Sequence, residues 1–82
     1  MAREIGTGVE ALRQFAEMCI RNGGVPQFKT RYGGQRLPEN TVIVSCWGAG
    51  DKVKGGKVKH VPPEVIAHLE RGVGDWRWLL SR

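Results

Sequence analysis

The sequence predicts an α+β fold in a single small basic domain that spans residues 1–82. Three observations predict it: apolar residues at helical spacing between positions 8 and 21, a run of β-branched and aromatic residues from Thr41 to Trp47, and a second helical pattern from Pro63. A chain of 82 residues supplies one modest core and little room for a deep catalytic cleft. A small all-α three-helix domain is the alternative.

The first helix is expected over Gly8–Arg21. Its apolar stripe recurs at Leu12, Phe15 and Cys19, and Asn22 with the following glycines ends it. Thr7 and Glu10 have the spacing of a capping box, in which each side chain accepts the backbone N–H of the other residue. Residues 1–6 are expected to be a loose start.

The sheet is expected between residues 27 and 60, all antiparallel. Residues 27–37 contain the turn signal Gly33–Gly34 and fit either a short edge hairpin, which we slightly prefer, or an ordered basic loop. The run Thr41–Trp47 fits a buried strand, because β-branched and aromatic side chains suit a pleated surface. It is too short to cross a membrane.

A lysine-rich hairpin is the main expectation for residues 52–59. The pair Gly55–Gly56 separates two Lys-Val-Lys segments, which is a signal for a two-residue hairpin turn. Val53 and Val58 would then share one face and the four lysines the other. Such a ribbon has the size to enter a DNA groove, although the lysines would also keep an edge strand soluble.

The second helix is expected to begin within His60–Glu64, since proline is tolerated in the first turn of a helix, and to end at Arg71 with Gly72. A turn follows at Gly74–Asp75. The tail from Trp76 to Leu80 is too apolar to extend into water. We expect it to dock on the core as a strand or helical turn; if exposed, Trp76 and Trp78 would form a dimer or partner patch.

The cysteines and the chain start indicate the compartment. Cys19 lies on the apolar face of the first helix and Cys46 inside the apolar strand, so we expect two free, buried thiols. The segment Met1–Glu4 lacks the apolar stretch of a signal peptide. A cytoplasmic, reduced protein is predicted.

Motifs for catalysis, cofactors and metals are not found. The glycine-rich stretch 48–57 fails the phosphate-loop spacing, because Asp51 and Val58 stand where glycine and Ser/Thr are needed. It fails the dinucleotide pattern at Val53. His60 and His68 have no closely spaced partner for a zinc site. We therefore expect a binding protein rather than an enzyme, without a cofactor or metal.

The positive charge points to the partner. The net charge is +5, and residues 29–61 hold the whole excess. This concentration predicts a surface that binds phosphates or an acidic protein. The candidate binding residues are Lys29, Arg31, Arg36, Lys52, Lys54, Lys57 and Lys59. Phe28, Tyr32 or Trp47 would stack on bases if exposed, but each is better explained as part of the core, because the aromatic residues must help to build so small an interior.

Several short motifs of the chain match the landmarks of a known domain family. They are residues 8–15 (GVEALRQF) with Val25–Pro26, then Trp47, Gly56–Val58, Pro63–Leu69 and Trp76-x-Trp78. The first two are similar to the opening helix of the helicase-associated domain family, and the others resemble its later landmarks. The resemblance covers most of the chain at scattered positions. It implies a compact helical, DNA-binding accessory module, which is the source of the all-α alternative.

Two functions follow as expectations. The first is a nucleic-acid-binding accessory or regulatory protein that contacts phosphates through the basic face of residues 29–59, with DNA preferred to RNA. The alternative is a small inhibitor or regulatory module that binds a partner protein through the basic hairpin or the tryptophan tail. A homo-oligomer built on the tail is a third arrangement, and no membrane partner is expected.

Overall fold

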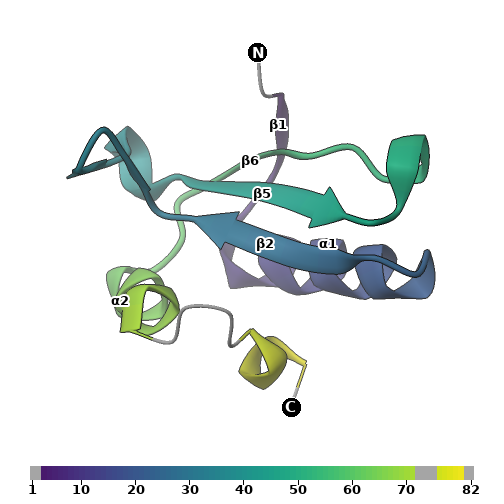
Figure 1. Ribbon diagram of the computed structural model, residues 1–82. Coiled ribbons are helices and arrows are strands. Elements are labelled where there is room, and N and C mark those ends of the chain that lie inside the picture. Colours follow the sequence, from purple (N-terminus) through teal and green to yellow (C-terminus); the bar gives the residue numbers. More distant parts are fainter. Residues whose placement is uncertain (1–2, 72–75, 81–82) are drawn as a thin grey trace.

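The computed structural model describes residues 3–71 and 76–80 and has the predicted α+β fold (Figure 1). Its main sheet has the strand order β1-β6-β5-β2. The all-α alternative is therefore wrong. The elements are β1 (Glu4–Thr7), α1 (Gly8–Arg21), β2 (Val25–Lys29), β3 (Arg31–Tyr32), β4 (Gln35–Arg36), β5 (Val42–Trp47), β6 (Gly56–Lys59) and α2 (Pro63–Arg71), with 3₁₀ turns η1 (Pro38–Asn40), η2 (Gly50–Lys52) and η3 (Arg77–Leu79).

Helix α1 has the predicted bounds, and its apolar stripe packs on the sheet. Leu12, Phe15 and Cys19 are buried in the core. The predicted capping box is wrong, because the Thr7 side chain makes no cap hydrogen bond. Thr7 belongs to strand β1, and Glu10 forms an ion pair with Arg13. Strand pairing and the ion pair thus replace the cap.

The sheet is mixed rather than antiparallel. Strand β1, which was expected to be a loose start, pairs in parallel with β6, and Glu4 lies opposite Lys57. The pairs β5–β6 and β2–β5 are antiparallel. Strand β6 is therefore an interior strand, hydrogen-bonded on both sides.

The predicted lysine hairpin is wrong. Lys52 ends the turn η2, and β6 begins at Gly56, so the second Lys-Val-Lys segment pairs with β5 and β1 instead of the first. Gly55 and Gly56 allow close approach of the backbone. A Cβ on Gly55 would lie 2.4 Å from the carbonyl oxygen of Val44, and one on Gly56 would lie 2.4 Å from that of Arg3. The glycine pair marks tight strand packing, which gives the same sequence signal as a turn.

A small hairpin forms instead within residues 27–37, as we slightly preferred. Strands β3 and β4 pair antiparallel, and Arg31 lies opposite Arg36. Gly33 and Gly34 join them with φ of 63° and 84°, the positive values that a two-residue hairpin turn requires. Residues 27–29 belong to β2 of the main sheet.

The two faces of the sheet differ. On β5, Val42 and Val44 point to a covered face and are buried. Figure 1 shows α1, α2 and the C-terminal turn on the same side of the strands, and Phe15, Ile66 and Leu79 belong to the same core cluster as those valines. The opposite side of the strands carries exposed residues, and we call it the open face.

A disulfide joins Cys19 of α1 to Cys46 of β5, so the expectation of two free thiols is wrong. Cys19 is buried, as predicted, whereas Cys46 is partly buried against the core. Neither the helical nor the strand periodicity indicates that the C-terminal end of α1 packs over the end of β5. That packing brings the two Cα atoms to 5.7 Å, within the range of a disulfide.

Helix α2 has the predicted span and buries Ile66 and Leu69. The tryptophan tail docks as a helical turn: Leu79 is 3% exposed, and Trp76 and Trp78 pack partly buried against the core. The Trp78 ring stacks on His68 at 4.3 Å between centroids. The predicted helix stop at Gly72 and the turn at Gly74–Asp75 lie outside the described residues. Across the part of the chain that is described, no helix has the length and apolarity to span a membrane.

Candidate nucleic-acid interface

The candidate interface is the open face of the main sheet. Strand alternation places on it the residues that lie between the buried ones. Strand β5 contributes Ile43, Ser45 and Trp47, of which Ser45 and Trp47 are exposed. The other strands contribute Val25, Gln27 and Lys29 from β2, Lys57 and Lys59 from β6, and Glu4 and Thr7 from β1.

Two lysines flank the middle of this face. In the sheet register Ile43 lies opposite Lys29 on one side and opposite Lys57 on the other. The three residues thus form one row across β2, β5 and β6. Backbones two strands apart are about 10 Å apart, so the two lysines stand on either side of an apolar residue. Neither lysine forms an ion pair with a described residue.

An aromatic ring lies at each end of the face. Trp47 ends β5 opposite Val25, and the two side chains are 71% and 46% exposed. Tyr32 is 67% exposed, and the Nζ atom of Lys29 lies 4.7 Å from the centre of its ring. Cation and ring attract each other in this geometry, which holds the phenol beside the open face. The face therefore combines flat apolar platforms with unpaired positive charge.

Lys59 also lies on the open face, but it forms ion pairs with two acidic residues. Its Nζ atom is 3.2 Å from an Oε1 of Glu39 and 3.8 Å from one of Glu4. The hydrogen bond to Glu39 raises the pKa of Lys59, and the negative charge of Glu39 adds to it. The backbone fixes Glu39 here, because its carbonyl accepts the N–H of His60. Lys59 is therefore a weaker candidate than Lys29 or Lys57.

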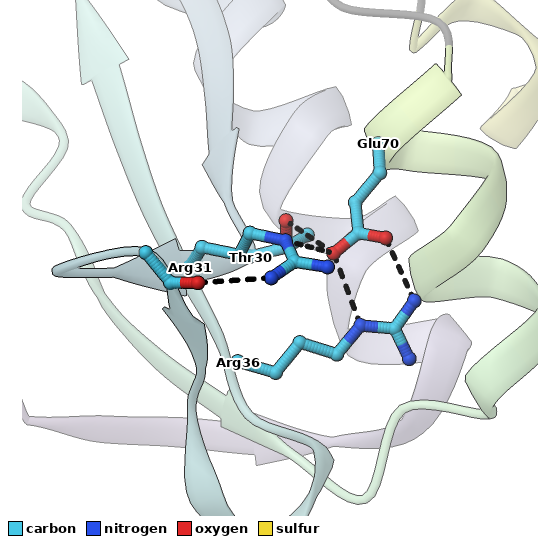
Figure 2. A network of polar contacts seen from close by, with 5 residues as sticks. Thr30, Arg31, Arg36 and Glu70 are labelled. Atoms are coloured by element: carbon cyan, nitrogen blue, oxygen red, sulfur yellow. Dashed lines mark hydrogen bonds and ion pairs between the residues drawn. The ribbon is translucent and has the colours of Figure 1, made fainter.

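The two predicted arginines serve a different contact (Figure 2). Arg36 donates to both oxygens of Glu70 in α2, from Nε at 3.1 Å and from Nη2 at 2.7 Å. The Nε of Arg31 lies 3.2 Å from the same carboxylate, and Thr30 donates its hydroxyl at 3.2 Å. The Arg36 hydrogen bond is the main cause that lowers the pKa of Glu70 to about 2. We call this group the Glu70 clamp, because it ties the β3–β4 hairpin to α2.

The remaining two lysines do not join the row. Lys54 lines a pocket of about 290 Å³ together with Phe15 and Met18 of α1, so it faces the helical layer. Lys52 is exposed on the turn η2. The seven basic residues are thus divided among at least three places. Lys29 and Lys57 remain as open-face lysines that form no ion pair within the described part of the chain.

The predicted aromatic residues are divided as well. Phe28 points to the covered face and packs on the core, so it does not stack on a ligand. Tyr32 is exposed, as stacking requires. Trp76 and Trp78 are half-buried in the docked tail, which leaves them a small part of their area for a partner.

Sequence reasoning gave too little weight to Trp47 and did not select Ile43. The signal was present, because strict alternation along Val42–Trp47 places Trp47 opposite to Val42 and Val44. A run of apolar residues suggests a strand buried on both faces, and under that assumption the alternation carries no information. Because this sheet has one covered face and one open face, the alternation predicts which side chains are exposed.

Comparisons of the chain with models of known protein families, with characterised proteins and with solved structures found no match. The resemblance to the helicase-associated domain family therefore stays a resemblance. Among residues 3–71 and 76–80, no group of three or more His, Cys, Asp or Glu side chains is placed to hold a metal ion.

Proposed function

We propose that the protein binds nucleic acid on the open face of its sheet, as an accessory or regulatory factor and not as an enzyme. The observation that carries the proposal is the row Lys29–Ile43–Lys57 between the exposed rings of Trp47 and Tyr32. Phosphates need unpaired cations, and bases need uncovered π faces. Open four-stranded sheets in other proteins bind RNA by stacking bases on exposed aromatic side chains.

The net charge supports the same partner. An excess of +5 attracts a polyanion over distances near the Debye length, about 10 Å at 0.1 M salt. Lys29 and Lys57 carry part of this excess, and neither forms an ion pair with a carboxylate of residues 3–71 or 76–80. Binding a phosphate chain would neutralise both and release counterions.

An acidic protein is the competing partner. The neighbouring side chains Val25 and Trp47 form an exposed apolar contact that a protein surface would also cover. Such an interface would depend on apolar burial at its centre and weakly on salt at its rim. Salt dependence therefore separates the two partners.

The test compares two double variants of equal charge. Lys29→Gln/Lys57→Gln removes the open-face lysines, whereas Arg21→Gln/Lys54→Gln removes two cations from the helical side. Affinity for a labelled 20-mer DNA and its RNA equivalent would be measured by fluorescence anisotropy over a range of salt concentrations. The logarithm of the binding constant falls linearly with the logarithm of the salt concentration. Each lost phosphate contact makes this fall shallower, by about 0.7 in slope on single strands and about 0.9 on duplex.

The expected slope change is thus about 1.4 to 1.8 for the open-face variant and near zero for the control. Equal weakening by both variants would mean that charge acts without a site and would refute the open face as the interface. Absence of binding to every nucleic acid at low salt would refute the function itself. Light scattering of the same samples reports whether a homo-oligomer forms.

We propose the cytoplasm as the location, but the Cys19–Cys46 disulfide removes the free thiols that favoured it and is typical of an oxidising compartment. In a reducing compartment the Cys19–Cys46 disulfide would be present as two thiols. Titration of free thiols in protein taken directly from cytoplasmic extract measures its state. A fully oxidised population would argue for an oxidising compartment instead.

A further inference from the structure

We infer that the open face selects single-stranded nucleic acid over duplex. This inference rests on the proposed function and specifies its ligand. Two exposed aromatic rings and a sheet surface wider than a two-stranded ribbon favour a single strand.

The rings at the two ends of the open face need unpaired bases. Trp47 and Tyr32 are the most exposed large apolar or aromatic side chains of the described residues. A base inside a duplex has both of its faces covered by its neighbours, so a protein ring stacks on it only after it has been unstacked. In a single strand every base has an accessible face, and each stacked base contributes without regard to sequence. The two rings are therefore useful to a single strand and inaccessible to an intact duplex.

The order of the rings and lysines along the open face suits an extended chain. Trp47 and Ile43 are four residues apart on β5, which corresponds to about 13 Å along the strand. Tyr32 lies beyond that row, under the ammonium group of Lys29. A single strand laid along β2 and β5 would pass from the Trp47 ring, between Lys29 and Lys57, to the Tyr32 ring. Its phosphates would meet the lysines while its bases meet the rings.

The open face does not fit a groove of B-DNA. The major groove admits a helix or a two-stranded ribbon. In this protein β6 is an interior strand, so the lysine segment that would have formed such a ribbon is part of a wider sheet. The row Lys29–Ile43–Lys57 spans three strands, and the backbones of the two outer strands are about 10 Å apart. Its side chains lie on one face of the sheet. A duplex would touch this face only through its phosphates.

The test uses the full chain and three labelled probes: dT12, rU12 and a 12-base-pair DNA duplex. We expect the two single strands to bind at least about ten times more tightly than the duplex. Trp47→Ala should weaken single-strand binding by about 5- to 150-fold, and Tyr32→Ala by at least about 5-fold, the range observed when a stacking ring is removed. Both variants should leave the weak duplex binding within about two-fold of wild type.

The controls keep folding and stacking apart. Both side chains are exposed, so the thermal midpoints of the two variants should match that of the wild type. Trp47→Phe, which keeps an aromatic face, should retain most of the single-strand affinity. Phe28→Leu changes an aromatic residue of the covered face and should leave the affinity of folded protein unchanged.

The outcomes separate the two proposals. If the protein binds dT12, rU12 and duplex equally and Trp47→Ala has no effect, single-strand selection is refuted while nucleic-acid binding stands. Tighter binding to the duplex also refutes the selection. If none of the probes binds at low salt, the proposed function itself has failed.

Discussion

The two faces of strand β5 carry alternate residues of one short run and have opposite properties. Val42 and Val44 on the covered face are no more than 1% exposed, whereas Trp47 on the open face is 71% exposed. The covered face is closed by α1, α2 and the docked tail (Figure 1). An apolar run can therefore serve two purposes at once, with every second side chain in the core and the others at a surface.

The same division applies to charge. Seven basic residues lie between positions 29 and 61, but Arg31 and Arg36 hold Glu70, and Lys59 holds Glu39. Lys29 and Lys57 stand on the open face without such a partner among the described residues. The net charge therefore includes two kinds of cation: those that stabilise the fold through ion pairs and those that remain for a ligand.

The largest expected effect separates Phe15 from Trp47. Phe15→Ala empties a buried site beneath the sheet and should lower the free energy of unfolding by about 3–5 kcal/mol. Trp47→Ala removes a larger ring from the open face and should change that free energy by less than about 0.5 kcal/mol. Urea denaturation followed by far-ultraviolet circular dichroism measures both, and Phe15→Leu is the milder substitute if the alanine variant does not fold. A large loss for Trp47→Ala would show that the open face is covered in solution.

Removal of the disulfide should have the next largest effect. Cys19 and Cys46 are 27 positions apart, and a cross-link over such a loop stabilises by about 3 kcal/mol, chiefly by restricting the unfolded chain. Cys19→Ala/Cys46→Ala should therefore lower the urea midpoint, and a reducing agent should lower that of the wild type to a similar value.

The same experiment tests the covered face through stability and the open face through binding of dT12. The reducing agent should not alter the unfolding of the double alanine variant, which serves as the control. The covered face loses its link to α1, but the open face keeps its residues, so the folded fraction should bind dT12 as before. A wild type that does not respond to the reducing agent would contradict a stabilising disulfide.

The smallest expected effect concerns the Glu70 clamp and acid. The folded pKa of Glu70, about 2, lies below its ordinary value of 4.5, so the folded state binds this proton less readily than the unfolded state. The stabilisation is therefore complete above pH 4.5 and is lost as the pH falls toward 2. Glu70→Gln should reduce the thermal midpoint at pH 6 and flatten its decline in acid, while dT12 binding at pH 7 is retained. An unchanged acid profile would mean that the clamp does not form in solution.

Much of the fold could be predicted because local signals agreed with the final packing. The bounds of α1 follow from its apolar stripe and from Asn22 and the two glycines that end it. The hairpin at Gly33–Gly34 follows from the need for positive φ at both positions. These features depend on residues that are close in the sequence.

The errors concern contacts between distant residues. Gly55 and Gly56 resemble a hairpin turn, but they make room for the backbones of Val44 and Arg3. Cys19 and Cys46 each look like ordinary core residues until α1 is placed over β5. At the candidate site, Lys29, Lys57 and Tyr32 were selected for their charge or ring. Arg31 and Arg36 looked equally suitable, but both form ion pairs with Glu70, which lies far along the chain in α2.

The parallel pairing of β1 with β6 sets an order for folding. Strands β5 and β6 are separated by a short stretch of sequence, whereas the paired residues Glu4 and Lys57 are separated by most of the length of the chain. Closing so long a loop costs more chain entropy than joining neighbouring strands, so we expect β1 to join the sheet after β2, β5 and β6 are assembled. On the ribosome, β1 and α1 emerge long before β6 exists. Strands β2 and β5 can cover part of the α1 stripe as they are made, but the part that packs on β6 stays uncovered until that strand appears. We therefore expect chaperones and proteases to reach α1 mainly during that interval.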